Sequence, residues 1–426
     1  MERYSEYKDS GVKWLGEIPS HWEVKRLASF FIERRVKVSD KDYEPLSVTK
    51  RGVFPQWENV AKTNDGDNRK LVKKGDFVIN SRSDRKGSSG VSDRDGSVSL
   101  INIVLQPRYT IRADFSNYLL KSYKFIEEFY RNGRGIVADL WTTRFDEMKM
   151  IKLAIPTIEE QIAIAKYLDS VTAKIDEAIA QQQKMIDLLN ERKQIIINKA
   201  VTKGLDPNVK MKPSGIDWIG DIPKHWMVVP IKRFIDVRDG THDTPSYIPQ
   251  SKNAYPLVTS KDFIDGKICF NDVKWISYND FIEINRRSHV SKYDVLTSMI
   301  GGNIGKSVIV DSDNQFAIKN VALFKTHGDY KLAKFIYYYM VGGLIKTQVE
   351  INSKGGAQSF LGLNDMRNLI YFVISTDERN EIVDYLDNRC NRIDKAIENA
   401  NKQISLLQER KQIIINDVVT GKVKVV

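Results

Sequence analysis

The octapeptide ERKQIIIN occurs twice in this 426-residue chain, at residues 191–198 and again, 218 residues later, at 409–416. The residues before it match at the same offset, because YLDSVTAKIDEAIA (167–180) corresponds to YLDNRCNRIDKAIE (385–398). Self-similarity at a fixed period is the mark of a repeated structural unit. The chain therefore contains two tandem copies of one unit.

A second repeated segment lies at the start of each copy. SGVKWLGEIPSHWEV (10–24) returns as SGIDWIGDIPKHWMV (214–228), here after 204 residues. Because this offset is 14 residues shorter than the first, the second copy must be longer in its middle. The ends match closely and the middles do not, which indicates a shared frame that carries two different inserts.

The matching segments predict two long helices. From Ile158 to about Ala200 the chain has no Pro or Gly and is rich in helix-forming residues, and Gly204 and Pro207 then end the pattern. One stripe of mostly apolar positions, which also includes Thr172, Gln182 and Lys193, alternates spacings of four and three, a period of 3.5 that is typical of a coiled-coil seam. The expected seam consists of Leu168, Ile175, Ile179, Ile186, Leu189 and Ile196 in the first helix, and Leu386, Ile393, Ile397, Ile404, Leu407 and Ile414 in the second.

A long surface helix packed on its own domain would also be apolar along one stripe. Two matched copies in one chain favour a pair of helices instead. Two equal units around a closed axis give a pseudo-twofold, under which the helices run antiparallel. We therefore expect an α/β (α+β) fold with two globular domains in a pseudo-twofold arrangement, joined by two long helices that form an antiparallel coiled coil.

The expected boundaries follow from the repeats. The first globular domain should cover residues 1–155 and the first long helix 156–205. The second globular domain should cover 206–374, with its copy of the repeated segment at 214–228, and the second long helix and tail 375–426.

Within the middles, short apolar runs predict strands and longer mixed runs predict helices. In the first middle, GDFVIN (75–80), SVSLINIVLQP (97–107) and IKLAIP (151–156) are strand-like, and SNYLLKSYKFIEEFYR (116–131) is expected to form a helix. Each middle is therefore expected to be a mixed α/β domain.

Composition limits the partners and the compartment. The formal net charge is +11 with a pI near 9.2, which favours a polyanionic partner. The two cysteines, Cys269 and Cys390, occupy non-equivalent positions and suggest a reducing compartment without disulfides. No apolar stretch approaches the ~20 residues of a membrane span, and MERYSEYKDS (1–10) has no signal-peptide core, so we expect a cytoplasmic protein.

Basic and amide side chains gather beside Gly, Ser and Thr in the predicted loops, a combination that suits phosphate and base-edge contacts. Any one of these loops could simply be solvated, and the signal is the set. The candidate DNA-binding residues are Lys50, Arg51, Arg82, Arg85, Lys86, Arg134 and Arg144 in the first copy, and Arg238, Lys261, Lys306, Lys319, Lys354 and Gln358 in the second.

Catalytic and cofactor motifs are sparse. GGNIGKS (301–307) is similar to a phosphate-binding loop, but Ile300 stands where that motif needs Gly, and the strand-like VIV follows instead of a helix. A hairpin turn with Lys306 near DNA is the better prediction. The histidines show no metal-ligand spacing, and His21 and His225 are expected to be packed structural residues. We therefore expect no catalytic residues, no metal and no cofactor.

These segments together resemble a known family. WLGEIPSHWEV, the helix start IPTIEEQIAIAKYLD (155–169), ERKQIIIN and the doubling of all three are similar to the specificity subunit of a type I restriction–modification system. One departure is the second helix start, ISTDERNEIVDYLD (374–387), which lacks the counterparts of Pro156 and Gln161.

The resemblance implies a division of labour. Each middle would be a target recognition domain that reads one half of a split, asymmetric sequence in double-stranded DNA, and the coil would set the unread spacer. Two methyltransferase subunits would dock on the coil, endonuclease/translocase subunits would join through the complex, and this chain would be non-catalytic. Two alternatives compete: an enzyme with its own nucleotide- or S-adenosylmethionine-dependent activity, and a coiled-coil adaptor that binds no nucleic acid.

Overall fold

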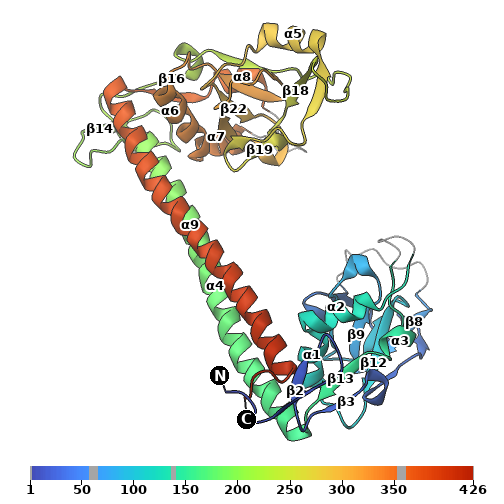
Figure 1. Cartoon of the computed structure of the whole chain (residues 1–426). Coiled ribbons are helices and arrows are strands. Elements are labelled where there is room, and N and C mark those ends of the chain that lie inside the picture. The colour runs from blue at the N-terminus through green and yellow to red at the C-terminus, as the bar shows by residue number, and fades with distance from the viewer. Residues whose placement is uncertain (1, 57–65, 136–140, 353–360, 426) are drawn as a thin grey trace. The chain divides into compact units, whose positions relative to one another are not determined.

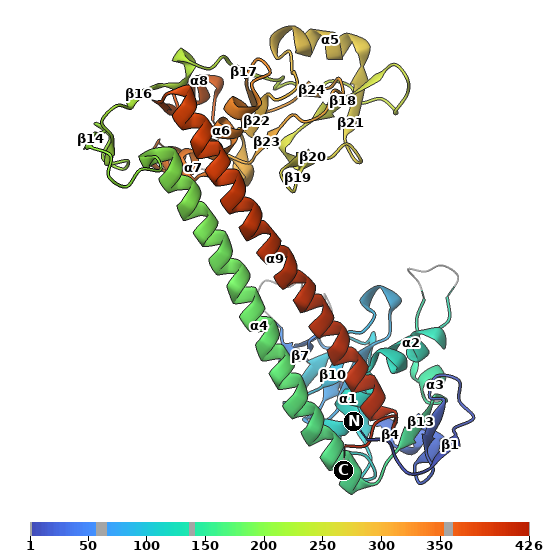
Figure 2. The same ribbon diagram turned by 60° about the vertical axis from the view of Figure 1, so that its left-hand side comes forward.

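The computed structural model divides the chain into two compact units that do not coincide with the two sequence copies. Unit 1 combines Met1–Gln183 with Asn401–Val426, and unit 2 is Lys184–Ala400. Each unit holds one globular domain and one part of each of two long helices (Figures 1 and 2). The structure describes residues 2–56, 66–135, 141–352 and 361–425.

The globular domain of unit 1 is built on a four-stranded antiparallel sheet with the order β10-β9-β12-β4. These strands are β4 (Phe31–Glu33), β9 (Phe77–Asn80), β10 (Ser89–Val91) and β12 (Asn102–Pro107). Helix α1 (Ala113–Lys121) packs on β9 and β10, and α2 (Tyr123–Arg131) follows it. The remaining elements are β1 (Tyr7–Asp9), β2 (Glu17–Pro19), β3 (Glu23–Arg26), η1 (Leu27–Ser29), β5 (Lys37–Val38), β6 (Leu46–Thr49), β7 (Gly52–Pro55), β8 (Arg69–Val72), η2 (Ser83–Arg85), β11 (Gly96–Val98), α3 (Phe145–Met148) and β13 (Lys152–Ile155).

The globular domain of unit 2 repeats this sheet as β23-β22-β25-β17. Its strands are β17 (Val237–Asp239), β22 (Val295–Ser298), β23 (Ser307–Ile309) and β25 (Val321–Phe324), with α6 (Tyr330–Val341) packed on β22 and β23. The remaining elements are β14 (Met211–Pro213), β15 (Asp221–Pro223), β16 (Met227–Pro230), η4 (Ile231–Arg233), β18 (Ala254–Val258), η5 (Ser260–Asp262), β19 (Phe263–Ile264), β20 (Lys267–Ile268), β21 (Lys274–Ser277), α5 (Tyr278–Arg287), η6 (Gly301–Asn303), β24 (Ala317–Ile318), α7 (Leu344–Asn352), α8 (Leu363–Arg367) and β26 (Ile370–Val373).

The two domains have the same repeated segments at their ends and different inserts between them, and an equivalent backbone hydrogen bond joins the ends of each insert. In unit 1 the backbone N–H of Leu27 donates to the carbonyl of Ile151 at 2.8 Å, and in unit 2 Ile231 donates to Leu369 at 2.8 Å. These equivalent bonds close the base of each insert. The extra length of the second copy lies between β17 and β22, where unit 2 holds α5.

Two local expectations have different outcomes. The single helix expected over 116–131 is wrong, because Ser122 takes an extended conformation and its hydroxyl accepts a hydrogen bond from the N–H of Phe125, which ends α1 and caps α2. The hairpin expected at GGNIGKS is confirmed, since the short turn η6 joins the antiparallel strands β22 and β23.

The repeated N-terminal segment supplies one tryptophan to each core. Trp22 is fully buried in a cluster with Phe115 and with Leu168 and Val418 of the long helices. In the core of unit 2, Trp226 is likewise fully buried among residues from both long helices. A buried tryptophan removes a large apolar surface from water, so these cores fasten the helices to the domains.

The long helices are α4 (Ile158–Lys203) and α9 (Thr376–Val419), which begin at equivalent positions of the two copies. The hydroxyl of Thr157 accepts from the N–H of Glu160 at 3.3 Å, and Ser375 caps α9 through Glu378 in the same way at 3.2 Å. Gly204, with φ +71°, follows the end of α4 and provides the left-handed conformation common after a helix.

The two long helices pack against each other in antiparallel orientation, as expected (Figures 1 and 2). In unit 1 the Lys411 ammonium lies 2.6 Å from the Asp176 carboxylate, and in unit 2 Lys193 lies 2.7 Å from Asp394. All twelve expected seam residues are buried or half-buried. Over the described ranges, no helix combines the length and the hydrophobicity that crossing a lipid bilayer would need.

Candidate nucleic-acid interface

The repeated His-Trp pair binds the first turn of each long helix. His21 Nε2 lies 3.0 Å from the Glu160 carboxylate, and Trp22 Nε1 donates to it at 3.5 Å. The same contacts recur in unit 2 between His225, Trp226 and Glu378, at 2.8 and 3.0 Å. The expected packed histidines are therefore wrong in detail: their side chains are 47% and 53% exposed, and only the adjacent indoles are buried. This pair fixes the helix start to its domain.

A tyrosine and an aspartate make a second repeated anchor. Tyr118 on α1 donates to the Asp169 carboxylate of α4 at 2.6 Å, and Tyr338 on α6 donates to Asp387 of α9 at 2.6 Å. Burial raises the pKa of Tyr118 to about 12, and the hydrogen bond to the Asp169 carboxylate adds to the shift. The pKa of Tyr338 is raised further in the same way, first by burial and then by Asp387.

The two long helices differ in sequence at their starts, where Arg379 stands at the position of Gln161, and each residue makes different hydrogen bonds. The Gln161 amide is fully buried, donates to the carbonyls of Thr110 and Pro156, and accepts from the N–H of Arg112. Its counterpart Arg379 instead donates to the carboxylate of Asp329, the cap of α6, at 3.0 Å. Both side chains tie the long helix to the start of an equivalent domain helix, α1 in unit 1 and α6 in unit 2.

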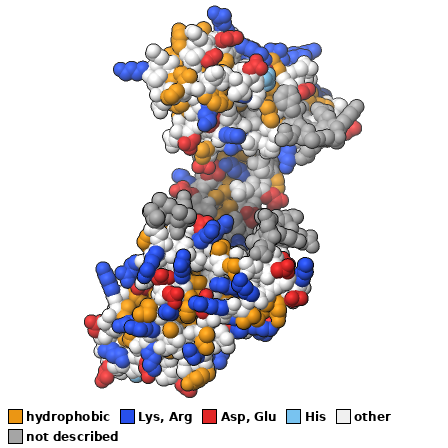
Figure 3. Space-filling model, turned by 90° about the vertical axis from the view of Figure 1, so that its right-hand side faces the viewer, with side chains coloured by type: hydrophobic (Ala, Val, Ile, Leu, Met, Phe, Trp, Pro, Cys, Tyr) orange, Lys and Arg blue, Asp and Glu red, His pale blue; other side chains and the backbone are white. Residues whose placement is uncertain are grey.

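In unit 1 the structure brings three candidate arginines together, which we call the arginine cluster: Arg82, Arg134 and Arg144. Arg82 and Arg134 each pair with Thr142 in an antiparallel bridge, and Arg144 follows two residues later. All three arginines are exposed. Unit 1 occupies the lower part of Figure 3, and many Lys and Arg side chains lie on the face of it that is turned to the viewer.

Only one arginine of the arginine cluster, Arg134, makes an ion pair with a residue that the structure describes. Arg134 Nε lies 3.3 Å from the Glu147 carboxylate, which also accepts from the backbone N–H of Arg144 at 3.1 Å. Arg82 makes no ion pair with any residue that the structure describes. Arg85 in the same turn lies 3.7 Å from Asp84. The guanidinium donors therefore remain largely open to a ligand.

The other unit 1 candidates lie apart from the arginine cluster. Lys86 makes an ion pair with Glu127 at 2.7 Å and lines a cavity of about 680 Å³ beside Trp14. Lys50 and Arg51 form the exposed turn between β6 and β7.

In unit 2 the structure places Lys261 and Lys319 on the wall of one cavity of about 660 Å³. Lys274 and Asn303 also line it and were missed, because single polar residues at a strand start and in a turn carry no pattern. Arg238 on β17 and exposed Lys306 do not line this cavity, and Arg238 pairs with Asp236. Lys354 and Gln358 lie outside the described residues.

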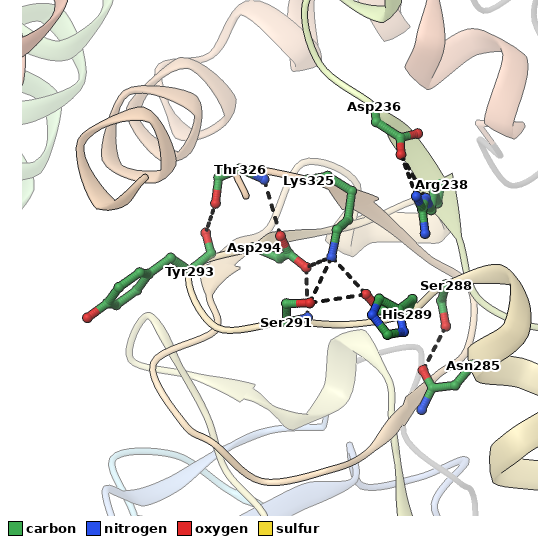
Figure 4. A network of polar contacts seen from close by, with 10 residues as sticks. All are labelled: Asp236, Arg238, Asn285, Ser288, His289, Ser291, Tyr293, Asp294, Lys325 and Thr326. Atoms are coloured by element: carbon green, nitrogen blue, oxygen red, sulfur yellow. Dashed lines mark hydrogen bonds and ion pairs between the residues drawn. The ribbon is translucent and has the colours of Figure 1, made fainter. Parts of the chain in front are cut away.

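A buried ion pair supports the sheet of unit 2 (Figure 4). Lys325 Nζ donates to the Asp294 carboxylate at 2.5 Å and to the carbonyl of His289 at 2.7 Å. The equivalent carboxylate of unit 1, Asp76, binds Arg34 through two hydrogen bonds of 2.6 and 3.0 Å. A buried charge needs such pairing, so this network stabilises the domain and is not available to a ligand.

The GGNIGKS turn does not have the geometry of a phosphate-binding loop. The segment leads into strand β23, so it places no helix N-terminus behind the turn, which phosphate binding of that kind requires. Among the described residues, no three His, Cys, Asp or Glu side chains are grouped to hold a metal ion.

Sequence comparison matches both copies to one family model. The model described as "Type I restriction modification DNA specificity domain" matches residues 19–186 and 223–406. The chain is 24% identical over 439 residues to the type I restriction enzyme MjaVIII specificity subunit of Methanocaldococcus jannaschii, covering 98% of this chain and 97% of that protein. It is 26% identical over 267 residues to the EcoBI specificity subunit of Escherichia coli, covering 60% and 56%.

Solved structures share the fold. A chain from a study titled "Structural basis underlying complex assembly and conformational transition of the type I R-M system" superposes with a TM-score of 0.68 at 14% identity, covering 94% of this chain and 98% of that one. The HsdS subunit of Thermoanaerobacter tengcongensis gives 0.51 at 15% identity, covering 95% and 98%. With both copies matched, this chain belongs to the specificity subunits of type I restriction–modification systems, the non-catalytic subunits that determine the DNA target.

Proposed function

We propose that this specificity subunit reads a bipartite, asymmetric target in double-stranded DNA, one half with each globular domain. The two target recognition domains would be residues 1–155 and 206–374, and the helices 156–205 and 375–426 would set the unread spacer. Methylation and cleavage would be carried out by methyltransferase and endonuclease/translocase subunits bound to it in the cytoplasm.

The observation that carries this proposal is that two equivalent sheets carry different side chains at the same turn. The turn after the central strand is Ser83–Arg85 in unit 1 and Gly301–Asn303 in unit 2, at equivalent positions of equivalent sheets. The residue before it is Arg82 in unit 1 and Ile300 in unit 2. Equal scaffolds with different side chains at the same place are what two different half-sites require, because base edges are read by particular side chains.

The coil carries features suited to a ruler and to two docking sites. At about 1.5 Å per residue, the 46 residues of α4 span about 69 Å. Leu188 and Ile195 of α4 are 55% and 59% exposed, and their counterparts Leu406 and Ile413 of α9 are 48% and 51% exposed. Exposed apolar positions repeated in both units are what two identical partners need, and this supports one methyltransferase subunit on each.

Methylome sequencing of the host, with and without the gene for this chain, tests the proposal. We expect N6-methyladenine in one motif made of two different words with a fixed gap, and we expect that motif to disappear on deletion. Complementation with the intact gene is the control. A motif that persists in the deletion strain, or a lost motif that is continuous or palindromic, would contradict the proposal.

A further inference from the structure

The arginine cluster presents its side chains on one face of a small backbone ribbon. Arg82, Thr142 and Arg134 lie directly opposite one another in consecutive antiparallel bridges. Residues that are directly opposite project from the same face of a sheet. Two strand spacings separate Arg82 from Arg134 at the backbone, about 9–10 Å.

The alternation of burial agrees with this geometry. Thr143 is fully buried, whereas Thr142 before it is half-buried and Arg144 after it is exposed. Successive residues of an extended chain point to opposite faces, so Arg144 lies on the face of Thr142. The arginine cluster therefore occupies the outer face of the ribbon.

Hydrogen bonds hold the ribbon from below. The N–H of Thr143 donates to the carbonyl of Ser81 at 3.0 Å, and its hydroxyl donates to the carbonyl of Phe129 at 3.0 Å. Trp141 Nε1 donates to the carbonyl of Tyr130 at 2.7 Å. A fixed backbone keeps the exposed arginines in place before DNA binds, which lowers the entropy lost on binding.

At the equivalent turn of unit 2, the described residues differ from those of unit 1. Ile300 stands at the position of Arg82, and Asn303 at that of Arg85. The candidate cations of unit 2 that share a site are Lys261 and Lys319, and they line a cavity instead. The candidates that the described residues bring together therefore differ: guanidinium groups in the arginine cluster of unit 1, and Lys261 and Lys319 with the amide of Asn303 in unit 2.

We propose that unit 1 reads guanine, with Arg82 donating to O6 and N7 of a guanine in the major groove of its half-site; this rests on the proposed function. The major groove admits a two-stranded ribbon, such as the paired segments of Arg82 and Thr142 form, and a bidentate arginine is the commonest specific contact to guanine. The Arg82 guanidinium has no ion-pair partner among the described residues, so both of its paired donors are open to a base. Arg134, held by Glu147 on the same face, contacts the adjoining base pairs or phosphates.

The test uses the complex of this chain with its methyltransferase subunits and a duplex that carries the target. The half-site of unit 1 is assigned first, with a variant in which a copy of residues 27–151 replaces residues 231–369. Both halves of the DNA motif that this variant recognises should then carry the sequence read by unit 1. Each guanine of that half-site is then replaced by 7-deazaguanine, which lacks the N7 acceptor. One replacement should weaken binding about 5-fold, because it removes one of the two hydrogen bonds of a bidentate pair, which as a whole discriminates by about 1–3 kcal/mol.

Variants identify the residue. With Arg82→Ala, the same 7-deazaguanine duplex should bind no more weakly than the natural duplex, because the contact is already gone. Arg94→Ala, which changes an exposed arginine of unit 1 paired with Asp93, is the matched control and should keep the full sensitivity.

A unit 1 half-site without guanine would overturn the inference. So would an Arg82→Ala variant that weakens binding equally for all sequences, because that result marks a phosphate contact. If the unaltered complex shows no preference for a bipartite site, the proposed function itself fails, and the two failures are thus distinguishable.

Discussion

Gly133 lies beneath the arginine cluster, in a place where no side chain fits. A Cβ atom there would come within 2.4 Å of Trp141 Nε1 and 2.8 Å of the Thr143 hydroxyl. Both neighbours are hydrogen-bonded and cannot yield freely. We expect Gly133→Ala to lower the stability of unit 1 by about 1–3 kcal/mol, the usual effect of overpacking, measured by thermal unfolding.

The control is Gly302→Ala, in the turn Gly301–Asn303 of unit 2. Among the described residues beyond its chain neighbours, none has an atom within 4 Å of a Cβ added there, so the unfolding temperature should be nearly unchanged. Equal stability of the two variants would contradict the close packing beneath the arginine cluster.

Tyr118 gives a stability that depends on pH. Its neutral hydroxyl donates to Asp169, and its pKa in the folded chain is about 12, above the ordinary value of about 10. A raised folded pKa means that the contribution is fully present below pH 10 and is lost as the pH rises toward 12. At pH 8, Tyr118→Phe should destabilise the chain by about 1–2 kcal/mol, and this difference should shrink by pH 11.5.

Paired thermal melts of the natural chain and Tyr118→Phe at several pH values measure the effect. Tyr109→Phe is the control, because Tyr109 is 95% exposed and should behave as the natural chain does. A difference for Tyr118→Phe that stays constant up to pH 11.5 would show that the Asp169 contact does not stabilise the fold.

At this scale, composition and loop context were enough to nominate Arg82, Arg134 and Arg144, because exposed cations beside Gly and Ser form a visible pattern. Their meeting around Thr142 was not predictable, since it depends on backbone bridges between segments about 50 residues apart. The binding of His21 to Glu160 was missed for the same reason, although both residues lie in repeated segments.

The long helices are the elements that the sequence predicts best. A 3.5-residue period without Pro or Gly leaves few alternatives, and α4 begins at Ile158, two residues after the expected boundary at residue 156. The break between α1 and α2 was missed, because it depends on a single extended residue, Ser122, within a run that favours helix. Short-range patterns predict the type of an element better than its boundaries.

The interhelical ion pairs belong to the register of α4 and α9. Asp394→Lys alone should destabilise the pairing of unit 2 by roughly 0.5–1 kcal/mol, because it sets two cations against each other. Adding Lys193→Asp should restore most of the loss, which thermal unfolding of the single and double variants measures. The equivalent exchange in unit 1, at Asp176 and Lys411, should give the same result. If the second substitution fails to restore stability at both sites, the register of the two helices is wrong.

The proposed ruler role depends on the length of the paired helices. Removing residues 181–187 together with 399–405 deletes one heptad from each and shortens the coil by about 10.5 Å, close to three base-pair steps. We expect methylome sequencing to show a spacer shortened by about three base pairs, or a loss of activity because the domains no longer match the turn of the DNA. Deleting one heptad from a single helix should abolish activity, and an unchanged spacer in the double deletion would refute the ruler role.

For the whole chain, the duplication was sufficient to predict two domains on one frame. The DNA word proposed for each domain was not predictable, because recognition depends on which side chains reach the groove, and equivalent turns carry Arg82 in one unit and Ile300 in the other. The frame is common because both units must hold the same helices, and the inserts are free to diverge between the bonds Leu27–Ile151 and Ile231–Leu369.

Exchange of an insert tests this account most directly. In a chain whose residues 231–369 are replaced by 27–151, both domains would carry the unit 1 surface, joined at equivalent hydrogen bonds. Methylome sequencing of cells that express this chain with its partner subunits should show a palindromic motif, made of the unit 1 word and its inverted copy around the original gap. If the modified motif still contains the unit 2 word, the globular domains do not read the target separately, and the account is wrong.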